Sequence, residues 1–366
     1  MKHMSKMAGR VVGIVTSLIA TCSLSMSAFA TTVTTENTEE MFLQYDHIEE
    51  LSDGGKIYVY IIDGIKNSFP VPPKGFDPLK ASDETLTTYG FPPRPSDVQE
   101  LDEWMEDMEA YEYTPVPEIQ KTDIVHGVYK PALNSDAVEN KICTNMVDSI
   151  NDNTYSTNWS GYVAKGNFAM VQGDFIQPTI NPSNPSYTHE STWVGLGGYS
   201  SNKLVQTGTA MNTYNGTNNY YAWYEYLGTS GSVPEIRFTN ITINPGDEIH
   251  TYCSFQGAND LFNAYVANNS NGTSQSVLVS LPASVYFDSS TAEFINEHPS
   301  WNVTDNGLTN YGTTKWKNCQ IYKMTNSWVN LGSTTYDLVT MTNSSQIKAK
   351  PSGLNGQTFT STWYNY

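Results

Sequence analysis

Hydrophobic and polar positions alternate over most of the second half of the chain, which is the pattern of half-buried β-strands. Residues 248–255 are one example, because every second side chain from Ile249 to Phe255 falls on the same face. The turn between two such runs has its own chemistry in the sequence Asn-Pro-Gly-Asp at 244–247. Many short strands joined by polar turns predict an all-β domain, an antiparallel β-sandwich, at residues 151–366. Further strands are expected at 167–175, 192–196, 220–226, 236–243, 277–281, 320–324, 336–341 and 357–364.

The first half of the chain has a different pattern. A buried strand is expected at 56–62, a proline-rich passage follows from 69 to 95, and one amphipathic helix comes after it. Ser96 and Gln99 have the spacing of a capping box at the start of this helix. Its apolar face is expected to consist of Val98, Leu101, Trp104, Met105 and Met108. Strand and helix together predict a smaller α+β segment at residues 31–150, ahead of the sandwich.

The first thirty residues have the organisation of a secretory signal peptide. Basic residues precede an apolar run at 11–20, and small residues then end in Ala28-Phe29-Ala30, an A-x-A cleavage site. The run is too short and too polar for a membrane anchor. We therefore expect residues 1–30 to be removed and the rest to be secreted to the extracellular space, with no membrane contact.

Charge separates the two halves further. Residues 31–150 hold 24 acidic and 8 basic residues, a net charge of −16, whereas residues 151–366 hold 13 and 8, a net charge of −5. An acidic chain without a basic patch argues against nucleic acid as a partner. The low charge density of the second half limits self-repulsion when acid protonates carboxylates, so it suits a protein that works at low pH.

Of the four cysteines, Cys22 leaves with the signal peptide and Cys143 lies near the boundary between the halves. Cys253 and Cys319 remain, and the sequence is compatible either with a disulfide between them or with two free thiols in the core.

Most familiar hydrolase motifs are absent: there is no H-E-x-x-H, no G-x-S-x-G, and no D-T-G or D-S-G. The histidines of the second half are too scattered to suggest zinc, so neither a metal nor a cofactor is expected. What remains is Gln206 and a few strand carboxylates, and from residue type alone none of them stands out. Those carboxylates are Glu190, Glu225, Glu235, Glu293 and Glu297.

Five short segments change this picture. They are Asn-Trp-Ser-Gly-Tyr at 158–162, Trp-Val-Gly-Leu-Gly-Gly at 193–198, Leu-Val-Gln-Thr-Gly at 204–208, Ala-Trp-Tyr-Glu-Tyr at 222–226 and Ala-Glu-Phe-Ile-Asn-Glu at 292–297. In this order and approximate spacing they resemble the glutamic peptidases, or eqolisins. The resemblance implies a sandwich of two antiparallel sheets and an endopeptidase that acts on proteins or peptides.

By the same resemblance, Gln206 and Glu297 match the catalytic pair, whereas Trp159, Trp193 and Glu225 match positions that line the substrate cleft. General chemistry is compatible with this assignment. Glu297 would take a proton from water and later pass one to the leaving nitrogen. Gln206 would orient that water and donate an N–H to the developing oxyanion.

Residues 76–78 and 89–95 resemble the leader of bacterial members, so residues 31–150 are expected to be a propeptide that inhibits the enzyme. Because both halves are acidic, their contact would use the apolar helix face, with local ion pairs at its edges. Carboxylates in such pairs would have depressed pKa values and lose the pairs in acid. We therefore expect the propeptide to loosen at low pH and to be cut between about 140 and 157.

Two other functions remain compatible with these residues. Glu225 and Glu297 could be the carboxylate pair of a glycoside hydrolase on a lectin-like sandwich, with Gln206 incidental. A carbohydrate-binding module could use the same tryptophans and tyrosines to stack on sugar rings.

Overall fold

The computed structural model describes residues 42–132, 153–182, 186–228, 231–232, 234–256, 260–281, 288–300, 306–343 and 346–364. The expected signal peptide, Cys143 and most of the expected cleavage region lie outside these residues. Within the described part of the chain, no helix is long and apolar enough to cross a membrane.

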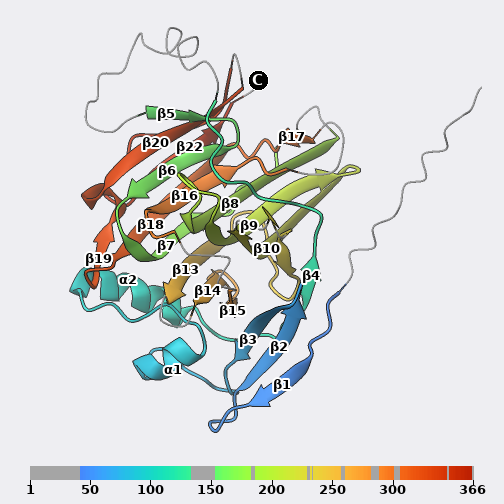
Figure 1. Ribbon diagram of the computed structural model, residues 1–366, viewed down its shortest axis with the longest axis vertical. Coiled ribbons are helices and arrows are strands. Elements are labelled where there is room, and N and C mark those ends of the chain that lie inside the picture. The colour runs from blue at the N-terminus through green and yellow to red at the C-terminus, as the bar shows by residue number, and fades with distance from the viewer. Residues whose placement is uncertain are drawn as a thin grey trace, which may run out of the picture. The chain divides into compact units, whose positions relative to one another are not determined.

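Strands of residues 153–364 form two layers of mostly antiparallel sheet (Figure 1). The first layer has the order β15–β14–β13–β7–β18, with β19 and β22 both paired to β18. Its strands are β7 (Phe168–Ile176), β13 (Glu248–Gln256), β14 (Leu261–Asn268), β15 (Thr273–Ser280), β18 (Thr313–Lys323), β19 (Ser327–Asn330) and β22 (Phe359–Trp363).

The second layer has the order β12–β10–β9–β8–β16–β6–β20 and carries the segments of the family resemblance. Its strands are β6 (Trp159–Lys165), β8 (Tyr187–Gly197), β9 (Leu204–Tyr214), β10 (Thr217–Gly228), β12 (Ile236–Phe238), β16 (Thr291–Glu297) and β20 (Thr335–Thr342). Shorter elements complete it at the edges: β5 (Asn153–Ser156), β11 (Gly231–Ser232), β17 (Asn306–Leu308), η1 (Leu331–Ser333) and β21 (Ile347–Pro351). β21 pairs with both β20 and β22, so the two layers join along one edge.

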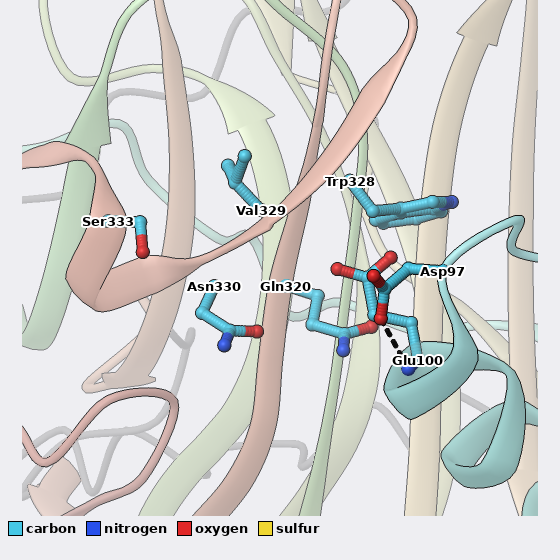
Figure 2. A pocket seen from close by; sticks show the side chains of 7 residues that line it. All are labelled: Asp97, Glu100, Gln320, Trp328, Val329, Asn330 and Ser333. Carbon is cyan, nitrogen blue, oxygen red and sulfur yellow. Dashed lines mark hydrogen bonds between the residues drawn. The ribbon is translucent and has the colours of Figure 1, made fainter.

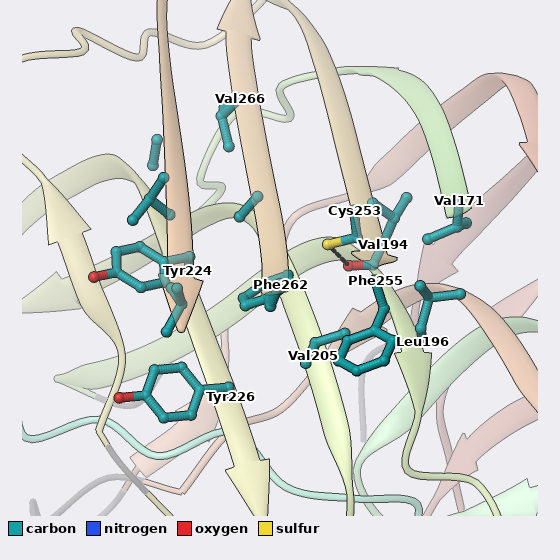
Figure 3. Close-up of a cluster of buried hydrophobic side chains, with 14 of the residues drawn as sticks. Val171, Val194, Leu196, Val205, Tyr224, Tyr226, Cys253, Phe255, Phe262 and Val266 are labelled. Atoms are coloured by element: carbon teal, nitrogen blue, oxygen red, sulfur yellow. Dashed lines mark hydrogen bonds between the residues drawn. The ribbon is translucent and has the colours of Figure 1, made fainter. Parts of the chain in front are cut away.

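Side chains from both layers interdigitate to form the main hydrophobic core. Val194 of β8 and Phe262 of β14 are fully buried in it, as is Cys253 of β13, whose thiol approaches the carbonyl oxygen of Val194 at 3.6 Å (Figure 3). These residues follow the period of two along their strands, which is why one face of each strand enters the core. The antiparallel sandwich expected from the alternation pattern is confirmed.

Residues 42–132, which we call the N-terminal segment, add strands to both layers. The segment contains β1 (His47–Glu50), β2 (Lys56–Ile62), β3 (Ile65–Val71), α1 (Asp83–Thr88), α2 (Val98–Glu109) and β4 (Ile119–Lys121). β3 pairs with β15 at one sheet edge, and β4 pairs with β12 at the edge of the other layer. Both edges are thereby protected by strands from the same segment.

The helices of the N-terminal segment cover the outer face of the first layer. Leu86, Trp104 and Met108 pack there against Tyr252 and Tyr265 of β13 and β14. For this reason β13 is buried on both faces, although its alternating sequence predicts one exposed face.

Two details of α2 differ from expectation. The side chain of Asp97, rather than Ser96, accepts a hydrogen bond from the backbone N–H of Glu100, at 3.4 Å. Val98 and Met105 are largely exposed, at 75% and 38%. The helix packs on the first layer through Trp104 and Met108, with Leu101 at the margin, so the buried stripe is centred on these residues and Val98 lies to one side of it.

The strands expected at 56–62, 248–255 and 336–341 correspond closely to β2, β13 and β20. The strand expected at 236–243 is shorter: β12 ends at Phe238. Beyond Phe238 the chain leaves the sheet, and Ile241 and Ile243 are buried in the core from an irregular segment. Burial thus accounts for their hydrophobicity without a strand.

Both remaining cysteines are free and buried, which answers the question that the sequence left open. Burial raises the pKa of the Cys253 and Cys319 thiols well above the usual value, so both are inert packing groups.

Candidate functional site

The expected catalytic residues lie on the outer face of the second layer. Glu297 of β16 pairs with Ser191 of β8, and Gln206 of β9 pairs with Gly195 of the same strand. Ser191 and Gly195 are four residues apart, so their side-chain positions share a face, and directly opposed residues share it with them. Glu297 and Gln206 therefore flank β8 on one face, and both are fully buried. Among the described residues, no hydrogen bond joins these two side chains directly.

Glu297 is held by donors from two of the resemblance segments. The indole Nε1 of Trp193 donates to Glu297 Oε2 at 2.9 Å, and the amide of Asn158 donates to Oε1 at 3.4 Å. Trp193 stands between Ser191 and Gly195 on β8, which explains how it reaches the carboxylate. These contacts fix the orientation of Glu297.

Gln206 is paired with Glu225, its direct neighbour across β9 and β10. The amide Nε2 of Gln206 donates to Glu225 Oε2 at 2.8 Å. The Oε1 atoms of Gln206 and of Glu225 are both buried without a hydrogen-bond partner among the described residues. Both atoms are therefore able to accept a hydrogen bond from a polar group of a ligand.

The residues expected to line the substrate cleft are gathered on this face. Trp159, Trp193 and Trp223 are fully buried in a second hydrophobic cluster, distinct from the core between the layers. The ring of Trp159 meets that of Trp193 edge to face, with centroids 5.1 Å apart. The five residues expected from the family resemblance therefore lie on one face of the second layer. They are Gln206, Glu297, Trp159, Trp193 and Glu225.

Residues 122–132, the covering segment, run across this face and bury it. The Thr122 amide N–H donates to the Glu235 carbonyl oxygen, and the Glu235 N–H donates to the Ile124 carbonyl oxygen. Farther along, the indole Nε1 of Trp159 donates to the carbonyl oxygen of Gly127 at 2.9 Å. The covering segment therefore binds largely through its backbone, as an extended peptide would.

His126 of the covering segment reaches the centre of the site. Its Nδ1 lies 3.0 Å from Glu297 Oε2, and its Nε2 lies 2.7 Å from Glu235 Oε2. The backbone N–H of Gly127 donates to Glu297 Oε1 at 2.9 Å. The imidazole also stacks on Trp223, with centroids 3.7 Å apart and planes 9° apart.

Sequence reasoning did not identify the role of His126 or Glu235. His126 lies 171 positions from Glu297, and Glu235 lies outside the five segments of the resemblance. A lone histidine just ahead of the expected catalytic domain was the available signal, but by itself it does not indicate a contact.

Burial opposes the charge of His126, but hydrogen bonds to Glu235 and Glu297 outweigh it and raise its pKa to about 10. Burial also raises the pKa of Glu225 and of Glu293 well above the usual value. Both carboxyl groups are therefore neutral at low pH, because burial disfavours their charged form. The imidazole of His126 stays protonated across the acidic and neutral range.

Burial raises the pKa of Glu190 to about 8, against the lowering effect of hydrogen bonds from Asn296 and Thr192. Since the folded-state pKa lies above the unfolded value, the stabilisation is fully present below about 4.5 and is lost as pH rises through about 8. We expect the melting temperature of the protein to rise as pH falls from 8.5 to 5, as measured on the Gln206→Ala chain. Glu190→Gln should flatten this slope, because it removes a contribution of up to about 1.4 kcal/mol per pH unit to the free energy of unfolding.

Glu84→Gln, at an exposed position of α1, is the matched control and should leave the slope of melting temperature against pH unchanged. A Glu190→Gln protein with the same slope would contradict the assignment of this titration to Glu190.

One carboxylate–histidine cluster lies away from this face. Asp107 of α2, Asp174 of β7 and His250 of β13 have ligand atoms within 4.8 Å of one another. His250 Nδ1 lies 3.0 Å from Asp107 and 2.7 Å from Asp174. The other oxygens of these carboxyl groups accept hydrogen bonds from Asn269 and Asn318. We therefore interpret the cluster as an ion-paired bridge between α2 and the sandwich.

A pocket opens beside the start of α2, but it contains none of the candidate residues. Figure 2 shows Asp97 and Glu100 next to Gln320 and Trp328 of the β18–β19 hairpin. The remaining lining residues are Val329, Asn330 and Ser333. The candidate site is instead filled by the covering segment.

An antiparallel sandwich thus carries a buried glutamate, a buried glutamine and three buried tryptophans on one outer face. The model of the Peptidase A4 family matches residues 157–363. The chain belongs to this family, and it is a glutamic-type endopeptidase. The glycosidase and carbohydrate-binding alternatives are not favoured.

Several solved structures are similar. Scytalido-glutamic peptidase with a peptide-based transition-state analogue has 22% identity over 57% of this chain and 98% of its own, with a TM-score of 0.48. SCP-B, a member of the eqolisin family in a complex with the tripeptide Ala-Ile-His, has 21% identity over 57% and 98%, with a TM-score of 0.46. Aspergilloglutamic peptidase from Aspergillus niger has 23% identity over 48% and 99%, with a TM-score of 0.42. No curated protein sequence matches the chain.

Proposed function

We propose that the protein is a secreted acid endopeptidase, made as a proenzyme, in which Glu297 activates water and Gln206 stabilises the oxyanion. One observation carries this proposal: four groups contact the carboxylate of Glu297. They are the indole of Trp193, the amide of Asn158, the imidazole of His126 and the backbone N–H of Gly127. These four donors fix the orientation of the carboxylate, and a general base must be held in a fixed orientation toward the proton that it takes.

In the proposed reaction, the carboxylate of Glu297 takes a proton from a water molecule as its oxygen attacks the peptide carbonyl carbon. The protonated Glu297 then gives a proton to the amide nitrogen as the carbon–nitrogen bond breaks, which restores the carboxylate. Trp193 and Asn158 hold the carboxylate in one orientation through both steps.

Gln206 is suited to the oxyanion because its amide nitrogen carries two hydrogens. One N–H is bound by Glu225, which fixes which end of the amide is the donor, and the second N–H is left for the substrate. Glu225 is thus a positioning residue. Its raised pKa keeps it uncharged, so it does not add a negative charge next to the developing oxyanion.

We propose that the covering segment inhibits the proenzyme. Both oxygens of Glu297 accept hydrogen bonds from it: Oε1 from the Gly127 N–H and Oε2 from His126. A water molecule bound for attack needs one of these oxygens. The propeptide inhibition expected from the sequence therefore has a local basis, at a contact other than the helix face.

At the contact of α2 with the sandwich, the pKa shifts run opposite to those that the expected acid trigger requires. Burial raises, rather than depresses, the pKa of Glu103, and burial together with nearby Asp97 and Glu103 raises that of Glu100. Glu103 accepts hydrogen bonds from Gln320 and Gln357 of the sandwich. A raised pKa means that stability is present at low pH and lost as pH rises. Mild acid therefore strengthens this contact, and we propose that activation depends on cutting the chain.

The function is tested by incubating the full chain in acid with a denatured protein and, separately, with soluble polysaccharides. An aspartic-peptidase inhibitor and a chelator are added to parallel samples. We expect peptide products in the presence of both additions and no sugar release. Sugar release without peptide products would overturn the proposal.

The inhibitory role of His126 predicts that His126→Ala increases the activity of the intact chain. Loss of the imidazole leaves Glu297 Oε2 with the Trp193 indole as its donor and removes two hydrogen bonds that hold the covering segment. We therefore expect at least a tenfold higher initial rate on an added peptide. Rates are measured before the chain is processed, as followed on gels. The control is His47→Ala, which changes an exposed histidine of the N-terminal segment and should leave the rate at the wild-type value. An intact His126→Ala chain that is no more active than wild type would refute the inhibitory contact.

A further inference from the structure

The imidazole of His126 occupies a pocket whose walls belong to the sandwich. Trp223 of β10 forms one wall, and Glu235, next to β12, stands at the edge of the ring. Tyr221 donates its hydroxyl to Glu235 Oε1 at 2.6 Å, which leaves Oε2 for the ring nitrogen. The side chains of His126 and Glu235 are both fully buried.

The pocket is built for a planar cation. Both ring nitrogens of His126 lie within hydrogen-bond distance of a carboxyl oxygen, and an imidazolium, which carries a hydrogen on each nitrogen, satisfies both contacts at once. A parallel tryptophan face is favourable for such a ring. The raised pKa of His126 agrees with this protonation state.

The backbone around the pocket shows where a substrate histidine would lie relative to the cut. The amide nitrogen of Gly127, directly after the histidine, donates to Glu297 Oε1 at 2.9 Å. This is the kind of nitrogen to which Glu297 passes a proton in the proposed reaction. Before the histidine, Glu235 hydrogen-bonds the main chain at Thr122 and Ile124, contacts that any extended peptide can make.

We propose that Trp223, Glu235 and Tyr221 form a specificity pocket for a protonated histidine side chain of peptide substrates, and that the bond directly after this histidine is cut. This inference rests on the proposed role of Glu297. The bond between the histidine carbonyl carbon and the next nitrogen breaks; water supplies the oxygen on the carbon and the proton on the nitrogen. In a productive complex, the imidazole of the substrate histidine binds Glu235 and Trp223 but does not contact Glu297. Glu297 Oε2 can then bind the attacking water molecule.

The covering segment differs from such a substrate in two respects. Its ring also contacts Glu297 Oε2, and the segment is fixed on either side of the ring by Val125, which exchanges backbone hydrogen bonds with Ser300, and by Tyr129, whose N–H donates to Gly198. The same pocket therefore serves inhibition in the proenzyme and selection of substrates afterwards.

The test compares two peptides that span the sequence Thr-Asp-Ile-Val-His-Gly-Val-Tyr, one with the histidine and one with alanine in its place. The full chain is first incubated in acid until its activity on denatured protein is constant. We expect cleavage between His and Gly, with kcat/KM about tenfold to a hundredfold higher for the histidine peptide, mainly through KM. Glu235→Gln should bring this ratio close to one, whereas Glu248→Gln, in a surface ion pair with Lys317, should retain it.

The outcomes separate this inference from the proposed function. If denatured protein is cut but the two peptides are cleaved equally, or the cut falls elsewhere, the pocket assignment is wrong and the peptidase stands. If no substrate is cut, the proposed function fails and the pocket inference fails with it.

A second measurement does not depend on turnover. In the Gln206→Ala background, His126→Ala empties the pocket, and added imidazole at pH 5 should raise the melting temperature of this protein saturably by a few degrees. The same protein with Glu235→Gln should show no such rise. An equal response with and without Glu235→Gln, or no response in either protein, would overturn the pocket.

Discussion

Replacing Glu297 by glutamine is expected to abolish peptide cleavage while the protein stays folded. The change preserves size and shape and removes the group that accepts the proton from water. Among the described residues, no other carboxyl group accepts a hydrogen bond from the Trp193 indole or from the Gly127 N–H. We expect turnover on denatured protein in acid to fall to background. The full chain should also remain unprocessed, as followed by gel and N-terminal sequencing across a pH series.

The fold of this variant is checked by its melting temperature in acid, compared with that of the Gln206→Ala chain, which also remains intact. A folded Glu297→Gln protein that keeps a substantial fraction of wild-type turnover would remove Glu297 from the mechanism. Processing of the variant at the wild-type rate, after purification from other peptidases, would show that maturation is not self-catalysed.

Gln206→Ala is expected to lower turnover by about a hundredfold to a thousandfold, the size of effect seen when one oxyanion donor is lost. The loss should appear in kcat, because the proposed N–H bond strengthens only as charge develops on the carbonyl oxygen. Rates are measured on a peptide substrate under saturating conditions. Normal kcat with a higher KM would contradict the oxyanion role and leave Gln206 as a binding residue.

Glu225→Gln is the matched control for Gln206→Ala, since it alters the partner of Gln206 without removing the amide. A peptidase should lose less activity from this change than from Gln206→Ala. A glycosidase that used Glu225 and Glu297 as its carboxylate pair would instead be inactivated by it.

Local sequence determined the strands and their turns well. β2 ends where Asp63-Gly64 breaks the pattern, and Asp63 and Gly64 both adopt positive φ there, at 51° and 80°. Such signals are local because alternation and turn chemistry depend on neighbouring residues only. The start of α2 was expected one residue too early, since Ser96 and Asp97 are both good caps and sequence does not rank them.

The face of the sandwich that carries the site could also be selected from the sequence, but through resemblance rather than chemistry. Gln206, Glu225 and Glu297 read individually as ordinary polar strand positions. Only pairing in the sheet shows that β8 lies between Glu297 and Gln206 and that Glu225 is opposite Gln206. Register over such distances is a property of the whole sheet.

By itself, then, the sequence determined the all-β class, most strand positions and, with the family resemblance, the residues of the candidate site. The tertiary structure alone decided that the cysteines stay free, that helix α2 buries Trp104 rather than Val98, and that His126 lies against Glu297 and Glu235. The physical reason is the range of the interactions: strands and turns follow from near neighbours, whereas the contact of His126 with Glu297 spans 171 positions and depends on how a separate segment packs onto the finished sheet.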